Sequence, residues 1–402
     1  MTNIAILGFG VVGGGVANLL TKNYDCVEKF GGDKINVKYI LDLRDFPNSP
    51  FADRVVHDFD IILKDSEVSC VIEAMGGSHP AYEYTIAALK AGKNVITSNK
   101  EVVSKFGDEF LRIAAENNVC YRFEAAVGGG IPVISPVIDC IRHNRIKEIR
   151  GILNGTTNYI LTKMFSYGKS FDEALKDAQA FGYAERNPDA DVLGTDACRK
   201  ITILTALATG NLLNTDKVHT EGIISIKEND VKAAEKLNMK IKLLGRCIIN
   251  GDKAQVMVAP FMLEESSPLA CVSDVYNAVE VIGDPIDNVM FYGRGAGAGP
   301  TASAMVADLM QVLRSGRSYA CPEWTKDDTI LADFSDFNCR NYIALKDVGE
   351  KEISEVFGEV KTVLNKNEIF FITDTLSEDE CSELINKITE KGAKLKSRIR
   401  LV

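Results

Sequence analysis

One glycine turn near the N-terminus limits what this chain can fold into more than any other stretch. The apolar run 4–7 has the composition of a buried strand, and Gly8-Phe-Gly-Val-Val-Gly13 follows it directly. Apolar residues at helical spacing come next, at positions 16, 17, 19 and 20. Strand, glycine turn and helix in this order give the G-x-G-x-x-G pattern its meaning as a dinucleotide-binding site. A plain glycine-rich turn is the alternative.

Each glycine of the turn has its own task in such a site. Gly8 permits the tight turn, Gly10 lets backbone N–H groups approach a pyrophosphate, and Gly13 lets the helix lie close to the strand. The positive end of the helix dipole then faces the phosphates. We therefore expect an α/β fold in which residues 1–135 form a Rossmann-type dinucleotide-binding domain, completed by a returning helix around residues 300–318.

Strands and helices alternate over about the first 140 residues, which indicates a mostly parallel sheet. Further strands are expected at 37–41, 68–74, 94–97 and 119–123, with helices at 81–91 and 101–117. In such a sheet the ligand binds outside the carboxyl ends of the strands. Met75, Gly76 and Ser98 are therefore expected at the cofactor site, with Lys100 beside its nicotinamide half.

The end of the second strand carries two residues that favour different cofactors. Asp42 suits the ribose hydroxyls of NAD, although residues 24–34, a loop or helix tail, place it further from the glycines than usual. Arg44 could instead pair with the 2′-phosphate of NADP. The sequence predicts NADP or NAD, with a weak preference for NADP. A solvated strand end is the alternative for either residue.

Composition argues against several classes of partner. The net charge is −10 and there is no long basic run, which argues against nucleic acid or an anionic membrane as the main partner. The ten cysteines form no C-x-x-C pair, so neither a zinc site nor a redox pair is indicated. Without a secretory signal or an apolar run long enough to span a bilayer, a cytoplasmic protein acting on a small molecule is expected.

A second glycine-rich stretch, residues 124–136, bends into a helix. Its backbone cannot be held by side chains of its own, so something must bind the carbonyl groups or pack tightly on them. A hard cation bound by Glu124 and backbone carbonyls is one possibility. A structural hinge is the other, and the residues alone favour the hinge.

The middle of the chain places a carboxylate and a lysine on one helix face. A strand over 147–154 leads into the polar turn 154–158, and an acidic loop, 182–196, runs into a helix over 197–207. Asp196 and Lys200 are four residues apart. A lysine held by a carboxylate in a closed site can donate or accept a proton at a carbonyl oxygen. A surface ion pair of little energetic value is the alternative.

Two strands are expected over 241–262, joined by a hairpin turn at Asn250-Gly251. A glycine loop at 292–301 precedes a helix over 302–313. From residue 340 the order is strand, helix, strand, strand, helix, strand, which is typical of a small ferredoxin-like unit. Its expected strands are 341–346, 360–365, 368–373 and 394–401, and its helices are 351–359 and 378–390.

These segments together resemble the homoserine dehydrogenase family over nearly the whole chain. The segments that carry the resemblance are 8–13, 98–100, 124–132, 151–160, 182–185, 191–200 and 293–301. The resemblance implies reversible, NAD(P)H-dependent reduction of L-aspartate 4-semialdehyde to L-homoserine. Nothing in the chain resembles an aspartokinase, so the single-function form is expected.

The resemblance also implies roles for individual residues. Lys200 would be the proton donor or acceptor at the substrate oxygen, and Lys100 would lie between cofactor and substrate and polarise the same carbonyl. Asp196 would hold the substrate and order the proton path. Glu185 would bind the substrate ammonium group, with Asp191 nearby. Further positions that match cofactor or substrate contacts in the family are Phe9, Val12, Gly182 and Gly297.

For the bend at 124–131 the resemblance favours a monovalent cation such as Na⁺ over the hinge. The ligands it implies are Glu124 and the carbonyls of Val127, Gly129 and Ile131. Residues 136–320 would then be the α+β catalytic domain, through which the protein forms a homodimer or a higher homo-oligomer.

Residues 325–402 occupy the place of the ACT regulatory domain of the family. The usual Asp-x-Pro-Gly turn is replaced by Asp347-Val-Gly-Glu-Lys351, which puts the binding of an effector such as threonine in doubt. We expect an ACT-like domain that serves at least packing or assembly. Two rival functions stay open: a dehydrogenase of another amino-acid aldehyde, and a non-catalytic dinucleotide-sensing regulator.

Overall fold

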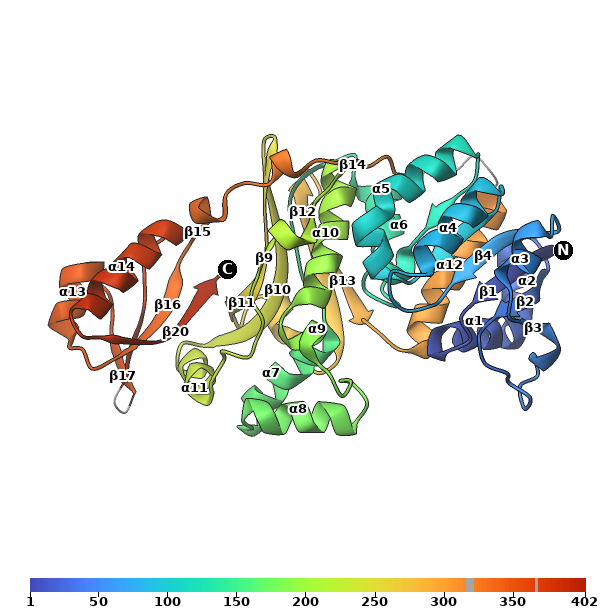
Figure 1. Cartoon of the computed structure of the whole chain (residues 1–402). Helices are drawn as coiled ribbons and strands as arrows, with labels where there is room; N and C mark the ends of the chain where they lie inside the picture. The colour runs from blue at the N-terminus through green and yellow to red at the C-terminus, as the bar shows by residue number, and fades with distance from the viewer. Residues whose placement is uncertain (316–321, 366–367) are drawn as a thin grey trace. The chain divides into compact units, whose positions relative to one another are not determined.

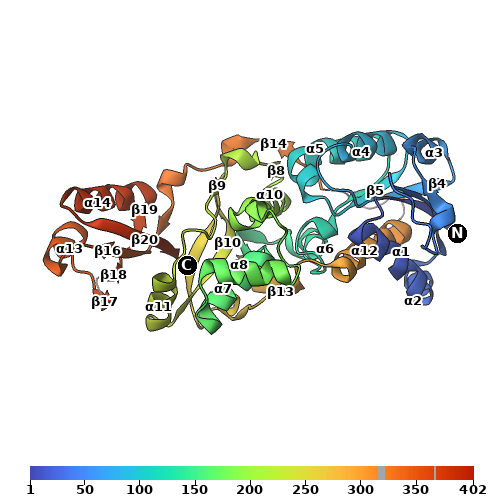
Figure 2. The same cartoon turned by 60° about the horizontal axis from the view of Figure 1, so that its bottom comes forward.

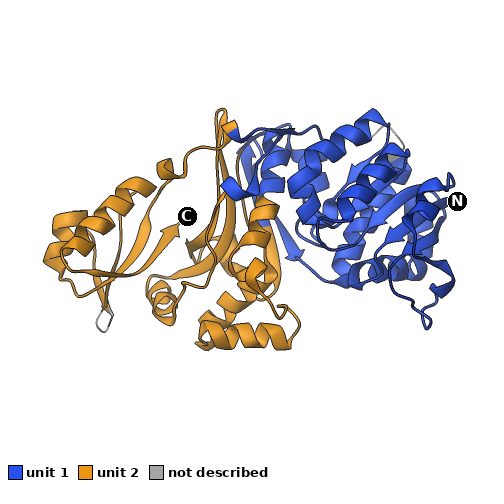
Figure 3. Ribbon diagram, viewed as in Figure 1, with its two compact units in different colours: residues 1–146, 202–217, 279–328 blue, residues 147–201, 218–278, 329–402 orange. Residues whose placement is uncertain are grey.

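The computed structural model describes residues 1–315, 322–365 and 368–402, and these form two compact units (Figure 3). Unit 1 comprises residues 1–146, 202–217 and 279–328, and unit 2 comprises residues 147–201, 218–278 and 329–402. The elements are labelled in Figure 1. The division into three domains ending at residues 135, 320 and 402 stays a prediction.

Unit 1 is built on a six-stranded parallel sheet. Its strands are β1 (Thr2–Leu7), β2 (Ile35–Leu41), β3 (Val55–Val56), β4 (Val68–Glu73), β5 (Asn94–Thr97) and β6 (Tyr121–Arg122). They lie in the order β3-β2-β1-β4-β5-β6, and every neighbouring pair is parallel. This is the strand order of a doubly wound dinucleotide-binding fold. The predicted Rossmann-type sheet is therefore confirmed.

Helices cover both faces of this sheet. Figure 2 shows α3 (Phe59–Lys64), α4 (Ala81–Lys90) and α5 (Lys100–Glu116) on one face, and α1 (Val11–Lys22) and α12 (Ala298–Ser315) on the other. α12 shares a core with β1 and α1, in which Ala302 and Met305 pack with Ile4, Ile6 and Val16. Residues 316–318 of the returning helix predicted at 300–318 lie outside the described residues.

The chain between α1 and β2 differs from the expectation. Residues 24–34 were expected as a loop or helix tail, but they contain a separate helix, α2 (Tyr24–Gly31), which ends at Gly32 with φ +84°. α2 buries Val27 in the same core as α1. Three charged residues among eight and only one deeply buried apolar residue make this helix hard to recognise from its pattern.

Unit 2 contains the predicted hairpin. β10 (Met239–Asn250) and β11 (Lys253–Glu264) pair without a break from Met239↔Glu264 to Asn250↔Lys253. β7 (Arg145–Ile152) pairs antiparallel with β10. The helices that precede this hairpin are α7 (Gly155–Tyr167), α8 (Phe171–Ala180), α9 (Asp189–Val192), α10 (Thr195–Thr209) and α11 (Glu228–Lys236).

Two long strands were not predicted from the sequence. β12 (Tyr276–Asp284) and β13 (Asp287–Arg294) occupy a stretch to which no strand was assigned. From Asn288 on, every second residue of β13 is exposed and none is fully buried, and its short apolar run, 289–292, leads directly into Gly293 and Arg294. The last residues of β13 therefore read as part of the glycine loop at 292–301.

The C-terminal part of unit 2 has the predicted element order. It comprises β16 (Asn341–Lys346), α13 (Glu350–Phe357), β17 (Val363–Asn365), β18 (Glu368–Ile372), α14 (Glu378–Glu390) and β20 (Lys394–Leu401). The strands lie in the order β20-β16-β18-β17, all antiparallel. β20 also pairs with β11, at Phe261↔Arg400 and Met262↔Leu401, so these strands extend the mixed sheet of the unit. The assignment as an ACT-like domain stays a prediction.

A search of the described residues for helices with the length and apolar composition needed to cross a bilayer finds none.

Candidate functional site

The glycine turn has the close backbone contacts that its sequence implies. Gly8 follows β1 with φ +90°, which disfavours any residue with a side chain. A Cβ atom at Gly13 would lie 1.9 Å from the carbonyl oxygen of Gly8. Gly10 caps α1, and a Cβ at Gly10 would meet no described atom within 4 Å. The first and third glycines therefore form the turn, while the second leaves the helix N-terminus open to a ligand.

Asp42 and Arg44 form an ion pair beside this turn. The Nε and Nη2 atoms of Arg44 donate to the two carboxylate oxygens of Asp42 at 3.0 and 3.1 Å. Asp42 also accepts the backbone N–H of Phe9 at 2.8 Å, which ties the turn to the end of β2. The hydrogen bond from Arg44 holds the pKa of Asp42 at about 2, although burial opposes this. The Arg44 side chain is 65 % exposed.

This geometry changes the interpretation of Asp42 and Arg44. By sequence alone they favour different cofactors, since Asp42 suits NAD and Arg44 suits NADP. In the structure Asp42 holds the Gly8–Gly10 turn and orients Arg44, so the two act together. The guanidinium group also lies 5.2 Å from the ring centroid of Phe46, which packs edge-on against Phe9.

The other predicted cofactor residues of the parallel sheet lie at the same end of it. Met75 and Gly76 follow β4, and Ser98 and Lys100 follow β5, which is the neighbour of β4. A Cβ on Gly8 would lie 3.1 Å from the Cγ atom of Met75, so the glycine turn and the loop after β4 are in contact. Lys100 is the first residue of α5 and is half-buried.

Two glycine-rich loops of unit 1 pack backbone to backbone. A Cβ on Gly129 would lie 2.4 Å from the carbonyl oxygen of Gly295, and one on Gly130 would lie 2.6 Å from the Cβ of Pro300. Gly130 also donates its N–H to the carbonyl of Arg294 at 3.2 Å. Gly129 and Gly130 are therefore required by the contact with the loop that precedes α12 and with the first turn of that helix. Gly297 in that loop is exposed and has φ +123°.

Glu124 has a role that the sequence did not indicate. Its buried carboxylate accepts the backbone N–H groups of Val133, Ile134 and Ser135 at 2.7, 2.8 and 2.7 Å. It therefore caps the start of the helical segment that follows the bend. Val127, Gly129 and Ile131 are also buried. The monovalent cation site stays a prediction.

In unit 2, Lys200 and Asp196 form a buried pair on α10. The Nζ atom of Lys200 donates to Oδ2 of Asp196 at 2.6 Å and to the carbonyl oxygen of Leu153 at 2.8 Å. The side chains are 9 % and 6 % exposed, so the pair is not the solvated surface pair considered as the alternative. Leu153 lies between β7 and α7, so this loop and α10 together fix the amino group.

Asn154 joins two of the predicted site residues, although spacing alone did not single it out. Its Nδ2 atom donates to Oδ1 of Asp191 at 2.7 Å and to Oδ2 of Asp196 at 2.9 Å. Its Oδ1 atom caps α7 by accepting the N–H of Thr157 at 2.9 Å. One buried amide thus joins the two carboxylates beside Lys200. The sequence feature that could have indicated Asn154 is its position at the end of a predicted strand, at the start of the polar turn 154–158.

The other predicted substrate residues differ from one another in their contacts and exposure. Asp191 is brought to Asp196 through Asn154, whereas Glu185 is exposed, and its backbone carbonyl accepts from Gln179 at 3.1 Å. Gly182 follows α8 with φ +73°. Next to it, the Tyr183 carbonyl accepts the hydroxyl of Thr156 at 2.6 Å, which holds the acidic loop against α7.

The arrangement in unit 2 suits proton transfer. An ammonium group can donate a proton to an oxygen that gains negative charge, and the buried carboxylate beside it orients the group and favours its charged form before the transfer. Lys100 belongs to unit 1 and Lys200 to unit 2. Each half of the candidate site is therefore described within its own unit.

The chain matches two profiles of one protein family. A profile described as homoserine dehydrogenase, NAD binding domain, matches residues 8–124, and one described as homoserine dehydrogenase matches residues 132–310. A homoserine dehydrogenase from Neisseria gonorrhoeae is 41 % identical over 315 residues, which cover 78 % of this chain and 72 % of that protein.

Solved structures agree with these matches. The homoserine dehydrogenase from Thiobacillus denitrificans has a TM-score of 0.92 at 33 % identity, covering 100 % of this chain and 98 % of that one. A hyperthermophilic archaeal homoserine dehydrogenase in complex with NADPH has a TM-score of 0.66 at 26 % identity, covering 77 % of this chain and 97 % of that one.

Proposed function

The chain belongs to the homoserine dehydrogenase family, and on that premise we propose how its residues divide the work of the reaction. Its activity is that of homoserine dehydrogenase, an oxidoreductase with an NAD-binding domain. Neither rival function, a dehydrogenase of another aldehyde or a non-catalytic sensor, is favoured by these matches. The proposals below concern the site residues, the cofactor preference, the cation and the assembly.

Lys200 is proposed as the group that protonates the substrate oxygen. A bound nicotinamide cofactor supplies the hydride that reduces the aldehyde carbon of L-aspartate 4-semialdehyde. As the oxygen gains negative charge, an ammonium group can stabilise it and then donate a proton. The observation that supports this role is the buried contact of Lys200 with Asp196, 2.6 Å long, which orients the amino group.

The remaining site residues are proposed to bind and orient. Lys100, at the start of α5, would polarise the same oxygen. Asp196 would hold the substrate and order the proton path, and Asp191 would share this task, since Asn154 joins both carboxylates. Glu185 would bind the substrate ammonium group, which its exposure in the acidic loop leaves it able to do.

The cofactor is proposed to lie along the carboxyl ends of β1, β2, β4 and β5. Gly10 and the N-terminus of α1 suit a pyrophosphate. The positions proposed to contact the cofactor are Gly8, Phe9, Gly10, Val12, Gly13, Asp42, Arg44, Met75, Gly76, Ser98, Lys100, Gly182 and Gly297. We propose NADPH as the preferred cofactor, because the guanidinium group of Arg44 is exposed and oriented by Asp42. The archaeal structure in complex with NADPH is consistent with this preference.

Replacing Arg44 with alanine tests the cofactor preference. We expect KM for NADPH to rise about 10–100-fold and KM for NADH to change less than about twofold, because a hydrogen bond to a charged group contributes about 1.5–3 kcal/mol. Steady-state kinetics with both cofactors measures this. Arg112→Ala, which removes an exposed arginine from α5, is the control. An equal rise for both cofactors would show that Arg44 acts by holding Asp42 and the turn, not by binding a phosphate.

A monovalent cation is proposed to bind at the bend that begins at Glu124. Carboxylate and carbonyl oxygens are the donors that hard cations prefer. The residues that would hold it are Glu124, Val127, Gly129 and Ile131. Since the carboxylate of Glu124 accepts three backbone N–H groups, its main-chain carbonyl is the donor better placed to serve.

The cation can be tested by stability as well as by activity. A ligand present at ten times its Kd stabilises the folded state by about 1.4 kcal/mol, which corresponds to about 2 °C in Tm for a protein of this size. We therefore expect sodium or potassium chloride to raise Tm by this amount over choline chloride of the same ionic strength. Equal Tm values in the three salts would contradict the site.

Assembly is proposed to involve the middle of the chain. A homodimer or higher homo-oligomer would form through residues 136–320. The C-terminal residues 325–402 are proposed as an ACT-like domain with a role in packing and assembly, which the pairing of β20 with β11 supports.

A further inference from the structure

A buried carboxylate outside the proposed catalytic set lies at the carboxyl end of β4. Glu73 is the last residue of that strand and has no exposed surface. Its Oε1 atom accepts the backbone N–H of Met75 at 2.7 Å, and its Oε2 atom accepts the hydroxyl of Thr97, at the end of β5. One side chain therefore contacts both of the loops that are proposed to receive the nicotinamide.

The contact with Thr97 continues to the start of α5. Thr97 Oγ1 accepts the backbone N–H of Asn99 at 2.9 Å. Asn99 caps α5 by accepting the N–H groups of Glu101 and Val102 at 3.2 and 3.4 Å, and its Nδ2 atom donates to the carbonyl of Gly77 at 2.7 Å. The loop after β4 and the first turn of α5 are thus held as one piece.

Lys100 lies inside this network. It follows Asn99 and precedes Glu101, whose carboxylate accepts the hydroxyl of Ser78 at 2.5 Å. The backbone of Lys100 therefore cannot shift without breaking bonds that trace back to Glu73.

We propose that Glu73 is a positioning residue, which fixes the Met75–Gly77 loop and the backbone of Lys100 through Thr97 and Asn99. The inference rests on the proposed function, in which these two loops receive the nicotinamide and Lys100 polarises the substrate oxygen. Glu73 does not touch the reacting atoms in this account. It holds the residues that do.

Burying this carboxylate lowers the stability of the fold, which argues for a functional reason to keep it. Burial raises the pKa of Glu73 to about 7, against the hydrogen bonds from Thr97, Met75 and Asn99. The titratable side chain that faces it is the buried Tyr121 on β6. Charging a buried carboxyl group without a cationic partner disfavours the folded state. Because the folded state binds the proton more tightly than the unfolded chain does, this carboxyl group makes stability fall as pH rises from about 4.5 towards 7.

Glu73→Gln separates positioning from simple packing. The amide has the shape of the protonated acid, so the variant should match the wild type at pH 6 and differ from it at pH 8. At pH 8 we expect KM for NADPH to rise about tenfold and kcat to fall about tenfold, because an acceptor for two donors is lost. Over the same range Tm of the variant should rise relative to the wild type, because the buried charge is absent.

The Thr97 link provides a second test that does not depend on Glu73 variants folding. Thr97→Val should reproduce the kinetic loss at pH 8, and Thr97→Ser, which keeps the hydroxyl, should restore the wild-type values. Thr85→Val is the matched control, since Thr85 is equally buried on α4 and its hydroxyl has no hydrogen-bond partner among the described residues.

Measured together, these variants separate the inference from the proposed function. A wild type that turns over, with Glu73→Gln unchanged in KM, kcat and pH profile, would overturn the positioning role alone. If Thr97→Val and Thr97→Ser both have a Tm at pH 8 far below that of the wild type, the positioning role is also overturned, because the role would then be structural. A wild type that neither binds NADP(H) nor reacts would remove both.

Discussion

Replacing Lys200 with methionine is expected to lower kcat by about 10³-fold, within the range of 10²–10⁴ that a general acid contributes. Methionine has a similar length but cannot donate a proton, so hydride transfer would leave an alkoxide without its proton donor. The dissociation constant for NADPH should stay within about twofold of the wild type, because a loss confined to the transition state lowers kcat and not cofactor binding. Single-turnover kinetics and fluorescence titration measure the two quantities.

The variant needs a stability control, since it leaves Asp196 without its cationic partner in a buried site. The double variant Asp196→Asn/Lys200→Met removes that charge and should fold as well as the wild type, while its kcat stays equally low. Lys163→Met is the matched lysine control on α7, where Lys163 pairs with the half-exposed Asp274. Near wild-type turnover by Lys200→Met would show that another group protonates the substrate.

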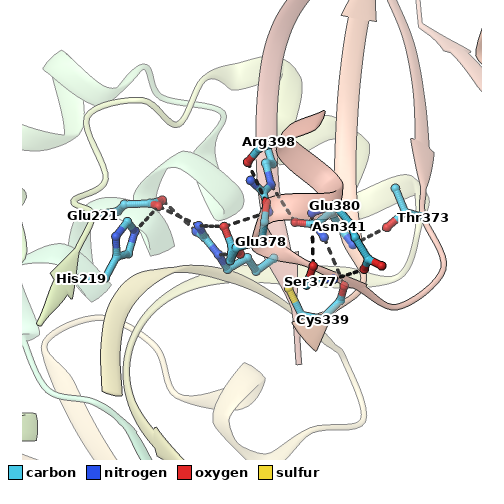
Figure 4. Close-up of polar contacts among 11 residues, drawn as sticks. His219, Glu221, Cys339, Asn341, Thr373, Ser377, Glu378, Glu380 and Arg398 are labelled. Carbon is cyan, nitrogen blue, oxygen red and sulfur yellow. Dashed lines mark hydrogen bonds and ion pairs between the residues drawn. The ribbon is translucent and has the colours of Figure 1, made fainter. Parts of the chain in front are cut away.

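The second large effect is expected at Arg400, which lies on β20 where that strand pairs with β11. Its Nε and Nη2 atoms donate to Glu378 at 2.7 and 2.9 Å, and its Nη1 atom donates to Glu221 at 2.9 Å. Figure 4 shows Glu221 with His219 on one side of this cluster and Glu378 with Arg398 on the other. Arg400 and Glu378 are each 4 % exposed.

Arg400→Met should lower the free energy of unfolding by about 3 kcal/mol, the lower end of the range for breaking a buried ion pair, because Glu378 keeps a second cationic partner in Arg398, 3.0 Å away. Urea unfolding followed by circular dichroism measures this. The single tryptophan, Trp324, is buried in unit 1 and reports on that unit by fluorescence. Lys391→Met, which breaks an exposed pair with Glu355 in the same region, should cost at most about 1 kcal/mol.

Arg400→Met should also make the protein more sensitive to acid. Burial opposes ionisation of Glu221, but the hydrogen bonds from His219 and Arg400 outweigh it and hold its pKa at about 2. A lowered pKa means that this carboxylate stabilises the fold above about pH 4.5 and that the contribution is lost as pH falls towards 2. Without Arg400 that contribution shrinks, so the acid transition should move to higher pH. An Arg400→Met protein as stable as the wild type would show that this buried cluster contributes little net stability.

Features set by residues close together in the chain could be predicted from the sequence. The pattern of strand, glycine turn and helix at 4–20 predicted the nucleotide-binding unit, because the glycines and the apolar spacing determine local structure among neighbouring residues. The hairpin at Asn250-Gly251 followed from its turn residues and the alternation on either side. Asp196 and Lys200 were placed on one face because four residues make about one helical turn.

Features that depend on residues far apart were decided by the tertiary structure. Spacing cannot show that Asn154 joins Asp191 to Asp196, because those residues meet only when α7 packs beside the acidic loop. It could not show that Asp42 holds the glycine turn through the N–H of Phe9, or that Glu124 caps a helix, since each carboxylate could as well have faced solvent or a ligand. The apolar and glycine pattern determined which local elements form, whereas the burial and pairing of individual charges depend on which elements pack together, and only the folded chain fixes that.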